Sequence, residues 1–231
     1  MLKLTPILLA VLYGLGMYVF SAWRLKSDLN QKSKPLQDPI LLTLTQRLAE
    51  SVDLPQIKVH VYDIEPVNGL AAPDGRIFIT RGFLQKYRQG QVSADELAGV
   101  IAHELGHVAL GHAKRRLVHF SLQNAMRVGV AMILNRFLPG IGIYVANALA
   151  SIFAAGLSRN DEYEADAYAA ALMTKAGIGT NPQKSLFAKL DHVIGAQAPQ
   201  VAWLMSHPKT EDRIKAIEVL EKKWGTLAHP K

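Results

Sequence analysis

The sequence predicts an α+β fold that is mainly α-helical and contains a small β-sheet. Apolar residues recur at helical spacing over several long segments, whereas only short segments alternate as strands do. Hydrophobic residues make up 49% of the 231 residues, which is enough for a core. The length fits one domain with an accessory segment. We expect that domain at residues 39–225, followed by a tail at 226–231.

The amino-acid composition restricts the kinds of metal site and binding partner expected for this chain. The chain has no cysteine, which excludes disulfides and thiolate metal sites, so a zinc site must use histidine and carboxylate ligands. The formal net charge of +7 suits an anionic membrane surface or nucleic acid. Because no nucleic-acid-binding motif is visible, we expect membrane lipid as a partner and no nucleic acid.

The amino-terminal segment, residues 1–25, reads as a transmembrane anchor. Leu4 to Trp23 are twenty residues without a charge, which is long enough for a helix to cross a bilayer. A cleaved signal peptide is the alternative, since Lys3 precedes the run and Val19-Phe20-Ser21 resembles a cleavage site. The length of the run and its aromatic end favour the anchor.

The charges around this run predict an orientation. Only one basic side chain precedes the run, and a group of basic side chains follows it: Arg24, Lys26, Lys32 and Lys34. By the positive-inside rule, the main domain of a protein in a bacterial-type inner (plasma) membrane then lies in the cytoplasm, with the periplasmic side as the alternative. Residues 26–38 are polar and lysine-rich, and we interpret them as a linker.

The domain is predicted to open with a helix and a small sheet. Asp38-Pro39 is a helix start, and the following apolar stripe comprises Ile40, Leu41, Leu44, Leu48 and Val52. Strands are expected at 57–62 and 76–80, with two turn signals between them. Either these form a meander, or residues 68–72 form an exposed edge strand that pairs with an extended peptide. The substrate-binding residues would then be Asn68, Gly69, Leu70, Ala71 and Ala72.

The central candidate site lies on a helix predicted over residues 94–113. Ser93 and Glu96 form a capping box at its start. His103 and His107, four residues apart, differ by about 40° in azimuth, so both imidazoles can reach one zinc ion. Glu104 would then stand beside the metal as a base rather than as a ligand.

A second apolar region covers residues 120–157. Arg127 and Arg136 interrupt its first half, which disfavours an independent membrane crossing. We interpret the region as a helical hairpin that turns near Pro139-Gly140. Two further transmembrane helices are the alternative, because an even number of crossings keeps both zinc-binding helices on one side.

The third metal ligand has two candidates in the sequence. His112 is nearest, but on a continuous helix it points about 140° away from His107. An acidic cluster at residues 158–166 predicts the start of another helix, on which Glu162 and Asp166 share one face. That face can supply one ligand and one carboxylate that orients a histidine. The alternative is that these acids only complement the helix dipole.

With these residues, the chain resembles the membrane-associated gluzincin family that includes HtpX and the CAAX prenyl endopeptidases. The resemblance spans Ile57 to Leu220 and includes the Ser-Arg-x-x-Glu-x-x-x-Asp segment that here begins at Ser158. It implies a zincin-type metalloprotease domain with one zinc ion per chain. It also implies that Glu162 is the third ligand and that Asp166 hydrogen-bonds to a ligand.

Two further family features have counterparts here. Asn68 begins a segment that looks like the family's edge strand, although Gly69 stands where alanine is more usual. Ser206-His207-Pro208 with Arg213 matches the family's carboxyl-terminal signature. The resemblance implies that His207 and Arg213 lie near the active site, where they stabilise an oxyanion or cover the metal. The alternative is a helix-start turn and an ordinary salt-bridged arginine.

The resemblance and the residues together predict a membrane-anchored zinc endopeptidase. Extended polypeptides are the expected partners, from unfolded, damaged or membrane-associated proteins. CAAX prenyl processing is disfavoured because those enzymes look built around many more membrane helices. The alternatives are a membrane adaptor or holdase that binds extended segments without cleaving them, and a latent protease whose hairpin 120–157 or His207 shields the zinc.

Overall fold

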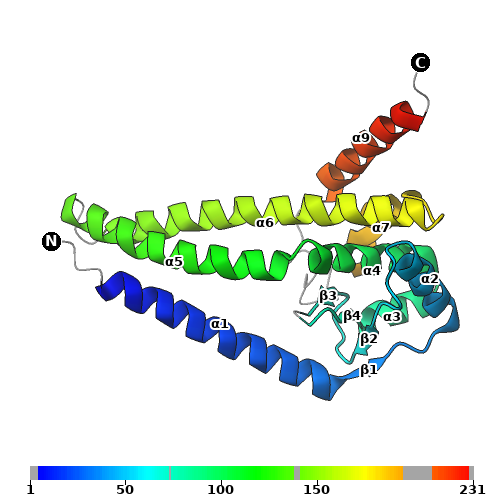
Figure 1. Cartoon of the computed structure of the whole chain (residues 1–231), viewed down its shortest axis with the longest axis horizontal. Coiled ribbons are helices and arrows are strands. Elements are labelled where there is room, and N and C mark those ends of the chain that lie inside the picture. The colour runs from blue at the N-terminus through cyan, green and yellow to red at the C-terminus, as the bar shows by residue number, and fades with distance from the viewer. Residues whose placement is uncertain (1–4, 73, 138–140, 195–209, 229–231) are drawn as a thin grey trace. The chain divides into compact units, whose positions relative to one another are not determined.

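The chain divides into two compact units. The computed structural model describes residues 5–72, 74–137, 141–194 and 210–228, whose helices and strands are labelled in Figure 1. The helical unit comprises residues 1–28 and 111–161, and the sheet unit comprises residues 29–110 and 162–231. Helices dominate, and the strands form a four-stranded sheet. The predicted α+β class is therefore confirmed.

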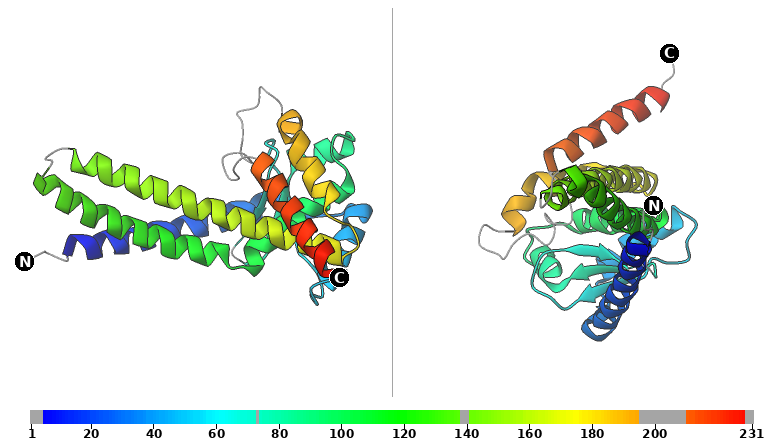
Figure 2. Two further views of the ribbon diagram at one scale, coloured as in Figure 1. Left: turned by 90° about the horizontal axis from the view of Figure 1, so that it is seen from above. Right: turned by 90° about the vertical axis from the view of Figure 1, so that its left-hand side faces the viewer.

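The helical unit contains two long helices that run side by side in both views of Figure 2. These are α5 (His112–Phe137) and the first part of α6 (Gly142–Lys175). Arg115 and Arg116, near the start of α5, pair with the buried carboxylate of Asp161 in α6, at 3.0 and 3.6 Å. These two helices cover much of the region 120–157 that was predicted as a hairpin, and the proposed turn at Pro139-Gly140 lies outside the described residues.

The first helix, α1 (Thr5–Lys32), covers most of the predicted anchor. Within the described ranges, however, no helix has both the length and the apolar character needed to cross a membrane. The structure therefore does not show the predicted transmembrane anchor at residues 1–25.

The sheet of the second unit has the order β1-β2-β4-β3. Its strands are β1 (Ser33–Pro35), β2 (Val59–Tyr62), β3 (Gly69–Ala71) and β4 (Ile77–Thr80). The outer strands pair antiparallel with their neighbours, while β2 and β4 pair parallel. A simple meander is therefore wrong, and β3 is the edge strand that the alternative interpretation predicted.

Residues 26–38 differ from the predicted linker. α1 continues to Lys32, and β1 then pairs with β2, with Leu36 N also donating to Val59 O. Polar side chains suit an edge strand that faces water, so composition alone did not separate this segment from a linker. The helix start predicted at Asp38-Pro39 is confirmed, because α2 (Pro39–Glu50) begins there and is capped by Asp38.

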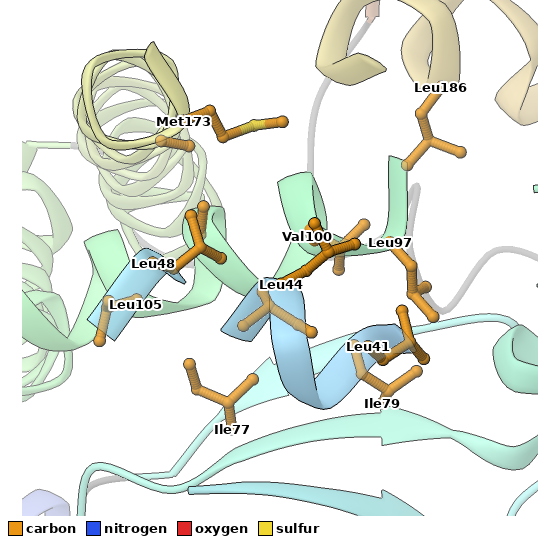
Figure 3. Packing of buried hydrophobic residues seen from close by; sticks show 14 of the residues in the cluster. Leu41, Leu44, Leu48, Ile77, Ile79, Leu97, Val100, Leu105, Met173 and Leu186 are labelled. Atoms are coloured by element: carbon orange, nitrogen blue, oxygen red, sulfur yellow. The ribbon is translucent and has the colours of Figure 1, made fainter. Parts of the chain in front are cut away.

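Helix α4 (Ala94–Ala109) is the centre of the sheet unit's core. Every residue from Glu96 to His107 is buried. Figure 3 shows apolar side chains from α2, β4, α4, α6 and α7 gathered around it. The residues labelled in Figure 3 are Leu41, Leu44, Leu48, Ile77, Ile79, Leu97, Val100, Leu105, Met173 and Leu186. The sheet unit also contains α7 (Asn181–Ile194), α9 (Thr210–Ala228) and the short α3 (Arg81–Arg88).

Two predicted helix boundaries are wrong. α4 was expected to reach residue 113, but it ends at Ala109 because Gly111 adopts a left-handed φ of 67° that stops the helix. His112 therefore starts α5, and the angle that excluded it as a ligand does not apply. The acidic cluster at 158–166 lies in the middle of α6, so its acids do not cap a helix start.

The start of α3 generates a stability prediction. A Cβ on Gly82 would lie 1.7 Å from the backbone oxygen of Glu65, which cannot move without shifting the chain. Gly82→Ala should therefore lower the free energy of unfolding by about 1–3 kcal/mol or more, measured by urea denaturation. Gly129→Ala is the control, because a Cβ there meets nothing within 4 Å. Equal stability of the two variants would contradict the prediction.

Candidate active site

Three potential metal ligands converge between α4 and α6. His103 and His107 come from α4, Glu162 comes from α6, and all three side chains are buried. The two histidine Nε2 atoms lie 3.1 Å apart. Glu162 Oε2 lies 3.3 Å from His103 Nε2, and its Oε1 lies 3.4 Å from His107 Nε2. The structure thus brings together the three residues expected to bind zinc.

A close approach of α6 to α4 makes this convergence possible. A Cβ on Gly106 would lie 3.1 Å from both Cα and O of Ala165, which is tighter than ordinary packing. Ala165 stands between Glu162 and Asp166 in the sequence of α6. Because a glycine faces an alanine here, both carboxylates reach the histidines of α4.

Asp166 lies behind His103 rather than among the ligands. Its Oδ1 is 2.9 Å from His103 Nδ1, so that Nδ1–H donates to the carboxylate and Nε2 keeps its lone pair. This hydrogen bond selects the tautomer and fixes the plane of the imidazole. Asp166 therefore lies where it can orient the His103 ring, the role that the family resemblance implied for it.

Arg213 in α9 holds Asp166 in turn. Its Nε and Nη2 donate to the two carboxylate oxygens at 2.6 and 2.7 Å, and its guanidinium packs 4.2 Å from the ring centre of Phe187. Arg213 has no exposed surface. The structure thus places it behind His103, as a salt-bridged arginine. His207, its predicted companion, lies outside the described residues.

The same contacts shift two pKa values in opposite directions. Burial raises the pKa of Asp166, but the charge of Arg213 and its hydrogen bonds outweigh burial and lower the pKa of Asp166 to about 2. Burial lowers the pKa of His103, but hydrogen bonds with Asp166 and Glu162 outweigh it and raise the pKa of His103 to about 9. The carboxylates around His103 therefore favour a positive charge at this imidazole, which either a proton or a bound metal ion can supply.

The site buries several ionisable side chains. Glu104, Glu162 and Asp166 are buried acidic residues, and Arg213 is the buried cation that pairs with Asp166. Buried negative charge is costly when it is unpaired, and a cation bound to the ligand group would compensate it.

Gln183 in α7 is a member of the site that the sequence did not predict. Its Nε2 lies 3.3 Å from Asp166 Oδ1, and its side chain is buried. It also lines a small cavity beside His103, with Val100 and Phe187 among the other lining residues. Only the pairing of α7 with α6 identifies Gln183, because a glutamine within an amphipathic helix carries no signal of its own.

The edge strand β3 passes directly beside Glu104. A Cβ on Gly69 would lie 3.3 Å from Glu104 Oε1. Asn68, just before the strand, has a buried Oδ1 that finds no hydrogen-bond partner within the described part of the chain. Leu70 packs with Phe78 on the face of the sheet opposite to Ile77 and Ile79, and Ala72 is buried there too.

The site thus combines three potential metal ligands, a further carboxylate and an edge strand that has no second neighbour among the described residues. Glu104, next to His103 in α4, is buried within reach of that edge. A metal-binding group of this kind with an adjacent base is suited to the hydrolysis of carbonyl compounds. An open strand edge is suited to an extended peptide.

Comparison with known proteins agrees with this chemistry. The family model for peptidase family M48 matches residues 35–221. The protease HtpX homolog of Acaryochloris marina is 29% identical, over 92% of this chain and 83% of its own length. Protease HtpX of Pseudomonas paraeruginosa is 27% identical, over 77% of this chain and 71% of its own length.

A third relative is the metalloprotease LoiP of Escherichia coli, which is 27% identical over 77% of this chain and 68% of its own length. The family model covers most of the chain and includes every site residue that the structure places. This protein therefore belongs to peptidase family M48 and is a metallopeptidase.

Proposed function

We propose that this protein is a zinc-dependent endopeptidase that cleaves extended segments of unfolded, damaged or membrane-associated proteins. The observation that carries the proposal is that Glu104, which directly follows the potential ligand His103 in α4, has its Oε1 3.3 Å from the Cβ position of Gly69 in the edge strand β3. The base, the metal ligands and the strand for the substrate would then meet at one point.

The spacing of the three ligands fits zinc. Ligands about 2.0–2.1 Å from a tetrahedral zinc ion lie about 3.3 Å from each other. The three measured separations, 3.1, 3.3 and 3.4 Å, are close to that value. Two neutral imidazoles and one carboxylate, with a fourth position for water, are also the ligand set of many catalytic zinc sites.

Zinc, when bound, supplies the Lewis acid that activates water and polarises a peptide carbonyl. The protein's own side chains transfer the proton and orient the ligands. The Glu104 carboxylate accepts the proton from the attacking water and then donates it to the leaving amine. Asp166 and Arg213 keep His103 oriented throughout, and burial of the site strengthens each of these interactions.

The edge strand supports polypeptide in extended conformation as the substrate. β3 hydrogen-bonds to β4 along one side only, within the residues that the structure describes. An added strand would satisfy its other side. Because folded proteins rarely expose a strand that can pair, unfolded or damaged chains are the favoured substrates. Asn68 Oδ1 offers a further acceptor for a substrate N–H.

Two substitutions separate the base from the ligand. Glu104→Gln should reduce casein cleavage by a factor of about 10²–10⁴ while zinc stays bound, because the base is lost and the ligands remain. Glu162→Ala should lose both activity and zinc, as measured by elemental analysis. Glu218→Ala, which removes an exposed glutamate of α9, should change neither.

The outcomes discriminate between the proposed functions. Full activity of Glu104→Gln would refute the mechanism, and stoichiometric zinc in Glu162→Ala would require another ligand. If the zinc-loaded protein bound peptides from a diverse library but cleaved none of them, the adaptor or holdase function would replace the endopeptidase.

The orienting pair gives a graded prediction. Asp166→Asn and Arg213→Lys should each weaken zinc binding about 10–100-fold, because His103 loses its fixed tautomer or Asp166 loses its two-point contact. Competition with a zinc chelator measures this change in both variants. An unchanged affinity in both variants would show that Asp166 and Arg213 do not support the ligand.

We also propose that α1 contacts membrane lipid. Its described residues expose many large apolar side chains to solvent: Leu8, Leu9, Leu12, Tyr13, Leu15, Met17, Val19, Phe20, Trp23 and Leu25. Basic residues follow directly, among them Arg24 and Lys26. Such a patch with adjacent positive charge suits an anionic bilayer.

Lipid contact predicts that the full chain floats with anionic vesicles. Binding should be stronger to vesicles that contain phosphatidylserine than to neutral ones, and it should persist in high salt because the apolar contacts remain. Absence from the vesicle fraction under both conditions would refute the proposal. A compartment-specific reporter fused near Lys231 would then decide between the cytoplasmic side, which the charges favour, and the periplasmic side.

A further inference from the structure

Gly69 is the point where the edge strand touches the helix of the site. Gly69 is buried, and a Cβ added to it would meet three side-chain atoms of α4 within 3.5 Å. The closest is Val100 Cγ1 at 2.8 Å, followed by Glu104 Oε1 at 3.3 Å and Glu104 Cγ at 3.5 Å. The first distance is shorter than carbon atoms tolerate.

The backbone of the same residue faces the side of β3 that has no neighbouring strand among the described residues. Asn68 O accepts a hydrogen bond from Thr80 N, and Ala72 N donates to Arg76 O. In an antiparallel pair, such bonds are made by alternate residues. The N–H and C=O groups of Gly69 and Ala71 therefore point away from β4. A peptide that adds to β3 would bond to these two residues.

Gly69 thus belongs to two contacts at once. Its backbone would hold the substrate strand, and its missing side chain lets that strand lie against the helix that carries Glu104. Val100 leaves little room for adjustment, because it is a β-branched residue with 3% exposure in the middle of a helix. A methyl group at position 69 would have to displace β3, since α4 is packed into the core.

We infer that Gly69 is a positioning residue that sets the distance between the substrate strand and the Glu104 base. The inference rests on the proposed endopeptidase function and adds the residue that aligns its substrate. It also gives a physical reason for glycine at this position. With valine at position 100, an alanine at position 69 would not fit at the present spacing of strand and helix.

A cycle of variants tests the inference with kcat, KM, zinc content and thermal unfolding. Gly69→Ala should lower kcat for casein peptides about tenfold to a hundredfold, because small displacements of a reacting group are costly. Zinc content should not change. In a Val100→Ala background, where Cγ1 is absent, the same substitution should lower kcat by a smaller factor, because β3 can keep its wild-type distance from α4.

Thermal unfolding provides a readout that does not depend on catalysis. Gly69→Ala should lower Tm in the wild-type background and lower it less in the Val100→Ala background, because the two residues are in contact. Gly225→Ala is the matched control. It adds a methyl group to a helix of the same unit where nothing lies within 4 Å, so kcat should stay at the wild-type value.

Each outcome decides a different point. An unchanged kcat in Gly69→Ala overturns the positioning role while leaving the endopeptidase intact. An equal loss of kcat in both backgrounds also overturns it, because the contact with Val100 is then not the cause. If the wild-type protein cleaves no peptide, the endopeptidase proposal fails first, and the role of Gly69 fails with it.

Discussion

The ion pair between Asp166 and Arg213 is the interaction on which the site depends. Both side chains are buried, and each carboxylate oxygen of Asp166 accepts a hydrogen bond from the guanidinium. Removing one partner of such a pair typically costs about 3–5 kcal/mol, because the other charge stays buried alone. The pair fixes His103, and it ties α9 to α4 and α6. Lys184 of α7 and Thr180, which directly precedes α7, reinforce this arrangement by bonding to Glu221 of α9.

Small residues around α4 are the second constraint. A Cβ on Gly99 would lie 3.3 Å from Met173 Sδ, and the close approaches at Gly106 and Gly69 admit α6 and β3. Dense packing would normally exclude charged groups, yet this helix carries two histidines and two glutamates on buried faces. The chain resolves part of this conflict by pairing several of these groups. Glu96, for example, is bonded to Ser93, Ser185 and Lys189.

Local rules predicted the elements whose causes are local. The capping box at Ser93, the Asp38-Pro39 helix start and the edge strand at residues 69–71 all follow from neighbouring residues, and all are present. The predictions that were wrong concern features that depend on a single backbone angle or on a residue far away in the sequence. Gly111 ends α4 early, β1 forms only because β2 lies beside it, and the parallel pairing of β2 with β4 has no local signature.

The candidate site divides in the same way. The sequence by itself determined that His103 and His107 share a face and that Glu162 and Asp166 share another, because helical periodicity holds within one helix. Tertiary structure alone decided which helices face each other. It placed Arg213 against Asp166, brought Gln183 to the same carboxylate and set Gly69 beside Glu104. These contacts join residues 17 to 47 positions apart, and their geometry depends on packing between elements rather than on the spacing of residues along the chain.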